Sequence, residues 1–253
     1  RCADRARAGL RGGAVHLHAV LMLPYPRVVF GIPVAGLILF VAFAALMLAV
    51  PRIDLAASAL FYTPGVGFTM NGQRWERIIY HSVEWLMVTV NLALVALWLF
   101  NRIARRTVLG FTGRKLALLL CLLAMLPGLL VNQVLKENWG RARPAQVTEF
   151  GGTHRFTPAF VYSDQEGGSF SSGHAAAACY LVAVAAVLRG PRSGWVLATA
   201  LYAALVGFAR MAAGGHFLSD VIISAFLVLF GYLALRRLFS AADVLPQSAQ
   251  HRH

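Results

Sequence analysis

The sequence predicts an all-α fold, a polytopic membrane helical bundle with six transmembrane helices. Three observations predict it: 58% of the 253 residues are apolar, only 13% are charged, and the apolar residues fall into long segments. A soluble core of this size does not need so much apolar sequence, so the excess indicates the bilayer as a second apolar solvent. At these segment lengths only helices satisfy the backbone hydrogen bonds in lipid.

Six predicted spans follow one another along the chain. They cover residues 28–50, 80–100, 116–135, 174–188, 195–208 and 217–235. About 20 helical residues cross a hydrocarbon core of roughly 30 Å, so the short fourth and fifth spans should extend into their flanking residues. Pro127 lies within the third span. We expect a basic cytoplasmic N-terminal tail at 1–27, one six-span domain at 28–237 and a C-terminal tail at 238–253.

The net charge of +13 indicates orientation in the membrane rather than a nucleic-acid partner. Arginine and lysine gather in the N-terminal tail, between the second and third spans, and after the fourth and sixth spans. Such residues mark cytoplasmic loops, so both termini should be cytoplasmic and the other loops should lie on the opposite side. Three cysteines show no zinc-site spacing and are expected to be packing residues.

Two further stretches lie between the predicted spans. Residues 53–62 are apolar but short, and an interfacial helix and a plain loop are both open for them. Residues 144–171 form a polar loop rich in Gly, Ser, Thr and Phe.

Unusual polar residues gather at the predicted non-cytoplasmic ends of four spans. They are Lys136 and Arg143 after the third span, Ser172, Gly173 and His174 at the start of the fourth, Arg210 at the end of the fifth, and His216 and Asp220 at the start of the sixth. The topology brings these ends to one membrane face.

Together these residue types suit a phosphate group, although a single Lys, Arg or His at a span end is more often an interface anchor. Cationic side chains bind phosphate oxygens, and a glycine at a helix N-terminus lets the backbone approach an anion. His216 and Asp220 are four residues apart, so the carboxylate can hold one ring nitrogen while the other attacks phosphorus. His174 can protonate the leaving oxygen and later activate water.

The spacing of these residues resembles that of the type 2 phosphatidic acid phosphatase superfamily, which includes vanadium haloperoxidases and glucose-6-phosphatase-like enzymes. The resemblance covers three motifs over residues 136–220, and the six-span layout extends it to 28–237. The motifs read Lys136, six residues, Arg143-Pro144; Ser172-Gly173-His174; and Arg210, five residues, His216, three residues, Asp220.

The resemblance implies a role for each of these positions. His216 matches the nucleophile, Asp220 its orienting residue and His174 the acid/base. The positions that match phosphate-binding residues are Lys136, Arg143, Ser172, Gly173 and Arg210. The family hydrolyses without a metal, so no metal or cofactor is expected.

Two positions in the motifs differ from the family pattern or add to it. The family's second motif usually begins with proline, whereas this chain has Ser171, which we expect to cap the helix. Arg141 is an additional basic residue in the first motif. It could contact a diphosphate or a second headgroup phosphate, but a solvated loop arginine is the favoured interpretation.

The resemblance implies a multi-pass lipid phosphatase of a bacterial-type inner membrane, with its site facing the periplasm. Its partners would be the bilayer and a phosphorylated lipid: lipid A, undecaprenyl diphosphate, phosphatidylglycerophosphate or phosphatidate. Residues 53–62 and 156–160 are similar to lipid A phosphatase-like members. A lipid phosphotransferase of the same superfamily, and a transporter or non-catalytic membrane protein, are the alternatives. The sequence does not indicate an oligomeric state.

Overall fold

The structure, a computed structural model, describes residues 27–241 and is mostly helical, which confirms the predicted all-α class. The main helices are α1 (Val34–Ala49), α2 (Arg52–Ala59), α3 (Arg74–Ile103), α4 (Gly113–Leu123), η2 (Ala124–Leu135), α5 (Lys136–Asn138), α6 (Gly173–Arg189), α7 (Gly194–Ala212) and α8 (Leu218–Ala241). Short elements lie between them: the two-residue strand pairs β1–β2 (Val28–Val29, Ile32–Pro33) and β3–β4 (Tyr62–Thr63, Gly67–Phe68), and the 3₁₀ turns η1 (Val108–Gly110), η3 (Pro144–Gln146) and η4 (Thr148–Phe150).

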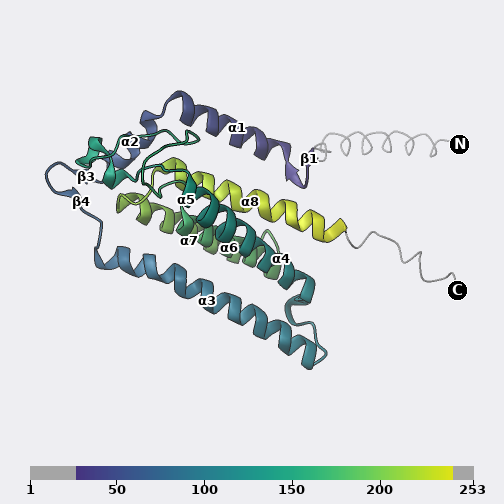
Figure 1. Ribbon diagram of the computed structural model, residues 1–253. Helices are drawn as coiled ribbons and strands as arrows, with labels where there is room; N and C mark the ends of the chain where they lie inside the picture. Colours follow the sequence, from purple (N-terminus) through teal and green to yellow (C-terminus); the bar gives the residue numbers. More distant parts are fainter. Residues whose placement is uncertain (1–26, 242–253) are drawn as a thin grey trace, which may run out of the picture.

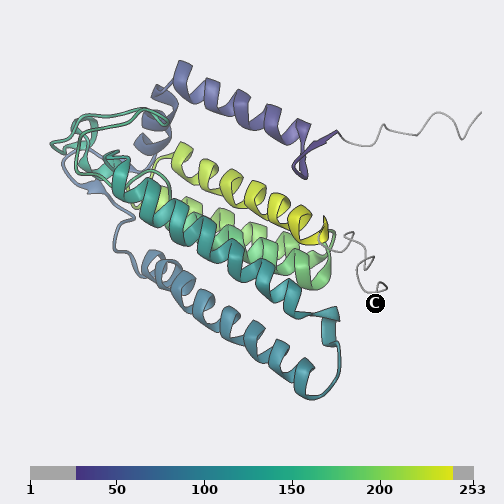
Figure 2. The ribbon, with the colours of Figure 1, turned by 45° about the vertical axis from the view of Figure 1, so that its right-hand side comes forward.

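The long helices run side by side along one axis, with α6 in the centre (Figures 1 and 2). α6 packs against α7, α8, α4 and η2, whereas α1 and α3 lie on opposite outer sides. The apolar core joins these helices through Leu119 and Leu122 of α4, Val131 of η2 and Tyr180 of α6, all of which are fully buried. Burying α6 explains its many alanines, because small side chains let neighbouring helices approach closely.

Membrane-spanning length is found in fewer helices than the six predicted. Within residues 27–241, four helices are long and apolar enough to cross a membrane: α3, the continuous helix Gly113–Asn138, α7 and α8. The pair α1 and α2 would make a fifth, although it is bent by 84°. α6 is apolar but has only 17 residues. It ends at Gly190, whose φ of +88° is disfavoured for residues with a side chain.

The third predicted span is a single helix whose second half widens into a π-helix. Pro127 lies inside it and has no N–H to donate, so the regular α-helical ladder is interrupted there. The Asn132 side chain donates to the Pro127 carbonyl at 2.7 Å. The π segment ends at Leu135, and Lys136 then starts the final turn at the end of the bundle.

Of the two possibilities for residues 53–62, the structure has a helix over most of that stretch. α2 covers Arg52–Ala59 and turns back toward the end of the bundle where α8 begins (Figure 1). Its buried residues, Asp54 and Ser58, are four residues apart and therefore lie on the same face.

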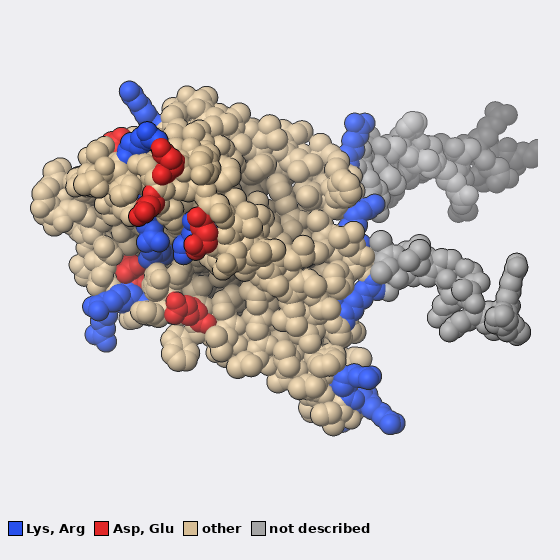
Figure 3. All heavy atoms as spheres, in the orientation of Figure 1, with Lys and Arg blue, Asp and Glu red and all other residues tan. Residues whose placement is uncertain are grey.

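On the face seen in Figure 3, charged residues gather toward the two ends of the bundle, with an uncharged band between them. In this view one end shows only Lys and Arg, whereas the other shows both signs of charge. The basic end contains Arg102 of α3, Arg189 of α6 and Arg236 of α8, three of the residues on which the predicted orientation rests. Most of the two expected tails, residues 1–26 and 242–253, lies outside the described residues.

Candidate active site

The three motifs meet at the end of the bundle that carries both signs of charge. Lys136 and Arg143 are brought together at Gly168, where an added Cβ would lie 3.4 Å from Lys136 Cγ and 3.7 Å from Arg143 Nη2. Neither cation has an ion pair with an acidic residue within 27–241. Two positive side chains without an acidic partner, in one partly buried place, are suited to binding an anion.

Arg210, at the end of α7, supplies the third positive charge. Its Nη1 donates to Glu76 Oε1 at 2.9 Å, and its guanidinium lies 4.8 Å from the centre of the Tyr80 ring. Nη2 lies against Gly215, where an added Cβ would be only 2.4 Å away. Glycine at position 215 therefore lets the Arg210 guanidinium lie directly against the backbone that precedes His216.

His216 lies between α7 and α8 and is 4% exposed. Its Nδ1 is 2.7 Å from the carbonyl oxygen of Ser169. A carbonyl only accepts, so Nδ1 carries the proton and Nε2 keeps its lone pair. Burial, with the positive charge of Arg210 adding to it, lowers the pKa of His216 well below its usual value. The ring is therefore neutral near pH 7 and can act as a nucleophile through Nε2.

His174, the second residue of α6, lies beside Tyr80, the ring that Arg210 also contacts. Its ring packs on Tyr80 at a centroid distance of 4.1 Å. Its Nε2 is buried and has no hydrogen-bond partner within the described chain. A buried polar atom without a partner is unusual in a folded protein and is typical of a position that meets a ligand.

The sequence-based role of Asp220 as the direct holder of the His216 ring is wrong. Asp220 Oδ2 accepts hydrogen bonds from Ser169 Oγ at 2.6 Å and from the Phe217 N–H at 2.9 Å, whereas the His216 Nδ1 partner is the Ser169 carbonyl. The four-residue spacing misled because His216 precedes the helix, which begins only at Leu218. Asp220 supports His216 indirectly, through Ser169.

The interpretation of Arg141 as a solvated loop residue is also wrong. Its side chain is fully buried, pairs with Asp54 at 2.8 Å and Asp220 at 2.5 Å, and donates from Nε to the Thr157 carbonyl at 2.8 Å. The Phe217 ring lies 4.4 Å from the guanidinium carbon. Arg141 is therefore an internal connector, whose buried guanidinium is bonded to Asp54, Asp220 and Thr157.

The entry to α6 differs from the prediction as well. The N-cap is Ser172, whose Oγ accepts from the Ala175 N–H at 3.4 Å, whereas the buried Ser171 Oγ has no hydrogen-bond partner within the described chain. The expected cap at Ser171 is thus shifted by one residue. Gly173 fits because an added Cβ would lie 2.5 Å from Asn132 Oδ1 of the neighbouring π-helix.

Sequence reasoning missed three residues of this site: Asp54, Glu76 and Ser169. The two acids flank apolar spans, and an acid at a membrane border is expensive enough to be a functional candidate in its own right. Ser169 contacts His216 through its backbone carbonyl, so no side-chain pattern could have marked that contact.

A family model described as the PAP2 superfamily matches residues 115–242, which include all three motifs. The chain belongs to the PAP2 superfamily. It is similar to proteins named Lipid A 4'-phosphatase: 31% identical over 251 residues to one from Rhizobium etli, covering 90% of this chain and 92% of that protein. Shorter matches are 39% identical to the protein of Francisella tularensis subsp. novicida and 36% identical to that of Rhizobium leguminosarum. They span 48% and 58% of the length of those relatives.

A solved structure, the crystal structure of the first transmembrane PAP2 type phosphatidylglycerolphosphate phosphatase from Bacillus subtilis, is also similar. The identity is 17% and the TM-score is 0.49, with 83% of this chain and 96% of that chain covered. The predicted resemblance to lipid A phosphatase-like PAP2 members is confirmed by the named relatives and the family model.

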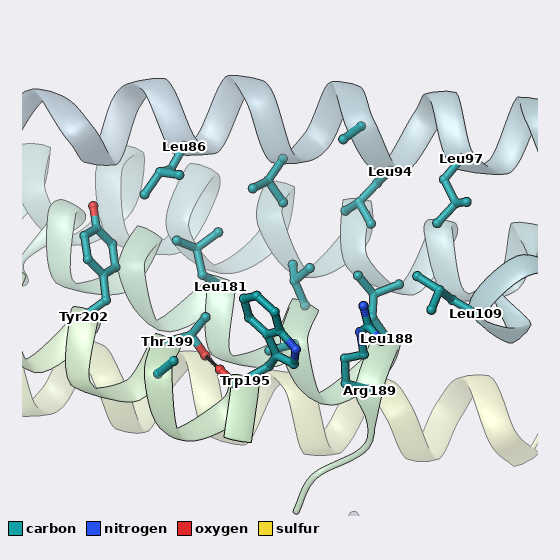
Figure 4. A pocket seen from close by; sticks show the side chains of 15 residues that line it. Leu86, Leu94, Leu97, Leu109, Leu181, Leu188, Arg189, Trp195, Thr199 and Tyr202 are labelled. Carbon is teal, nitrogen blue, oxygen red and sulfur yellow. Dashed lines mark hydrogen bonds between the residues drawn. The ribbon is translucent and has the colours of Figure 1, made fainter. Parts of the chain in front are cut away.

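Two further features of the structure concern metal binding and the cavities of this PAP2 protein. Among the described residues there is no group of three or more His, Cys, Asp or Glu side chains that could hold a metal ion. An apolar cavity of about 510 Å³ lies away from the motifs, between α3, α6 and α7 (Figure 4). It is lined by side chains such as Leu94, Leu181 and Trp195, and includes none of the motif residues. This cavity is thus separate from the cationic cluster at the end of the bundle.

Proposed function

We propose that this PAP2 protein is a multi-pass bacterial membrane phosphatase that removes a phosphate from lipid A by way of a phosphohistidine at His216. Membership of the family and the similarity to proteins named Lipid A 4'-phosphatase support a lipid phosphatase. The observation that carries the mechanism is the His216 ring, whose Nδ1 is held by the Ser169 carbonyl while Nε2 has no hydrogen-bond partner within residues 27–241.

In the first step, His216 Nε2 forms a bond to phosphorus and the bond from phosphorus to the lipid oxygen breaks. The leaving oxygen takes a proton from His174. Lys136, Arg143 and Arg210 neutralise the phosphoryl oxygens, where charge is spread in the transition state.

In the second step, water attacks phosphorus, His174 takes its proton, and the phosphorus–nitrogen bond breaks. The lone pair returns to His216 Nε2, and phosphate is released. Ser172 and Gly173 are proposed to add donors from the start of α6, with the helix dipole favouring the anion.

We place the site on the periplasmic face of a six-span domain, with both termini in the cytoplasm. The basic end of the bundle supports this orientation (Figure 3), because Lys and Arg mark the cytoplasmic side. α1 with α2 would be the first span. α6 would complete the count, because a helix buried among others need not match the full bilayer thickness.

The substrate is tested by giving the purified protein lipid A, undecaprenyl diphosphate, phosphatidylglycerophosphate and phosphatidate in separate assays. We expect free phosphate from lipid A, with loss of the 4' phosphate, at a rate well above that for the other three. Full activity in a chelator is also expected, since three side chains provide the positive charge. Transfer of the phosphate to a second lipid without release would instead identify a phosphotransferase, and preference for another lipid would remove lipid A as the substrate.

A further inference from the structure

Asp54 is a buried carboxylate that none of the three motifs contains. It lies in the first turn of α2, is 1% exposed, and precedes the residues 115–242 that match the family model. Its Oδ1 accepts from the Ser219 N–H at 2.9 Å. Its Oδ2 accepts from Ser219 Oγ at 2.6 Å and Arg141 Nη2 at 2.8 Å. Both carboxylate oxygens are therefore bonded to the framework of the site.

A continuous series of hydrogen bonds connects this carboxylate to the nucleophile. Arg141 Nη1 donates to Asp220 Oδ1 at 2.5 Å, and Asp220 Oδ2 accepts from Ser169 Oγ at 2.6 Å. The carbonyl of Ser169 then accepts from His216 Nδ1 at 2.7 Å. The backbone N–H of Ser169 donates to the Arg141 carbonyl at 3.0 Å, so Arg141 and Asp220 together hold Ser169 on two sides.

The charges in this series explain why a second carboxylate matters. Arg141 and Asp220 alone would form a neutral pair, but Asp54 shares the same guanidinium, so the buried group has one net negative charge when both carboxylates are ionised. His216 gains positive charge as its Nε2 bonds to phosphorus. A negative group held behind Nδ1 stabilises that change, as the carboxylate does behind the histidine of a serine protease.

We propose that Asp54 is a positioning residue for His216, acting through Arg141, Asp220 and Ser169 to orient the ring and stabilise its positive charge. This inference rests on the proposed function, in which His216 is the nucleophile. The proposal gives α2 a part in catalysis. If Asp54 only fastened α2 to α8, it would stabilise the fold without affecting catalysis.

The test compares Asp54→Asn with the unchanged protein, using an aryl phosphate as substrate and the full chain in detergent. Asparagine keeps the shape but removes the charge. We expect kcat to fall about 10–100-fold, by analogy with the loss found when outer partners of a metal-ligating histidine are removed. KM and the affinity for orthovanadate should stay within about twofold, because Asp54 does not contact the phosphate-binding cations. If Asp54 only fastened α2 to α8, Asp54→Asn would lower the melting temperature and leave the kcat of the folded protein unchanged.

Two controls separate positioning from packing. Ser58→Ala changes the same buried face of α2, where the Ser58 Oγ has no hydrogen-bond partner within the described chain, and should leave kcat unchanged. Asp54→Glu and Asp54→Gln form a second pair of equal size that differs in charge. If Asp54→Asn does not fold, the Gln variant should still be slower than the Glu variant by a similar factor.

A double-mutant cycle tests the route of the effect. If Asp54 acts through Asp220, the double variant with both changed to Asn should be about as slow as Asp220→Asn alone. Effects that multiply, or a normal kcat in folded Asp54→Asn, would overturn the positioning role. His216→Ala in the same assay distinguishes the two levels: normal turnover there would overturn the proposed function, and the role of Asp54 with it.

Discussion

At the scale of single residues, the site depends on which nitrogen of His216 carries the proton. The Ser169 carbonyl selects Nδ1–H, and burial beside a guanidinium keeps the ring neutral. In the proposed mechanism, both effects leave Nε2 available to phosphorus without a separate general base. The three cations would then hold and neutralise the phosphoryl oxygens.

The lowered pKa of His216 predicts that its ring stays neutral in mildly acidic buffer. A histidine with a depressed pKa takes up its proton only at lower pH, so the ¹⁵N spectrum of the ligand-free protein should keep the Nδ1–H form from pH 8 to below 6.5. The signal is identified by its absence from His216→Asn. A ring that titrates near pH 6.5 would contradict the buried, neutral nucleophile.

His174 and His216 should separate in a trapping experiment. An aryl phosphate has a good leaving group and needs little protonation, so His174→Ala should still form the phosphoenzyme but hydrolyse it slowly. We expect an acid-labile, base-stable label on that variant after rapid quenching, and none when His216 is also replaced. Absence of label from a folded protein that binds orthovanadate would exclude the covalent step.

Asp220→Asn should lower kcat by about 10–100-fold, because Asp220 acts on the ring through Ser169 rather than by direct contact. The measurement is kcat at saturating substrate, with melting temperature as the check on folding. A loss no greater than that of an exposed control such as Asp164→Asn would remove Asp220 from the mechanism.

At the scale of elements, the site is assembled where the ends of several helices meet. The first turn of α3 supplies Glu76 and the last turn of α7 supplies Arg210, whose side chains are 6% and 12% exposed. Their ion pair joins α3 and α7 beside the proposed phosphate site. It orients Arg210 but also satisfies part of its charge.

Replacing Glu76 should therefore reveal a coupling between helix packing and phosphate binding. Glu76→Gln is expected to lower the free energy of unfolding by about 1–3 kcal/mol without ligand, because Arg210 loses its charged acceptor. Orthovanadate should restore much of that loss, since the bound anion becomes the new partner, and should raise the melting temperature more than in the unchanged protein.

The matched control for this prediction is Glu84→Gln on the same helix. Glu84 is exposed, and its described partner is His81 at 3.8 Å. It should change neither the melting temperature nor the response to orthovanadate. An equal response to orthovanadate in Glu76→Gln and the unchanged protein would mean that Glu76 does not tune Arg210.

At the scale of the whole molecule, the face seen in Figure 3 has two ends of different charge with an uncharged band between them. The basic end joins the turns after α3 and α6, and the end with both signs carries the site. An uncharged band between charged ends is typical of a protein that crosses a bilayer.

The proposed orientation can be checked with single cysteines. Tyr162, 70% exposed in the loop beside the site, should as Tyr162→Cys react with a membrane-impermeant thiol reagent in intact spheroplasts. Arg105→Cys, after α3 at the basic end, should react only after lysis. Each is compared with the same protein lacking the added cysteine, because Cys121 and Cys179 are free thiols. The reverse pattern would place the site in the cytoplasm.

Several features of this protein could be predicted from the sequence because they are local or periodic. The apolar segments predict the helices, since helices in lipid must satisfy their own backbone groups. The positions of the motifs at the ends of the spans predict which polar residues meet. Consecutive antiparallel helices bring every second connecting loop to the same face of the membrane. The PAP2 resemblance, confirmed by the family match, follows from the same residues.

The roles of the connecting residues were decided only by the tertiary structure. Arg141 looked like a loop arginine because its partners, Asp54 and Asp220, are 87 and 79 residues away in the chain. The holder of His216 is a backbone carbonyl, which every residue has, so no pattern of side chains could identify Ser169. Chain periodicity determines which faces are buried, but which donor meets which acceptor depends on the path of the loops that the packed helices bring together.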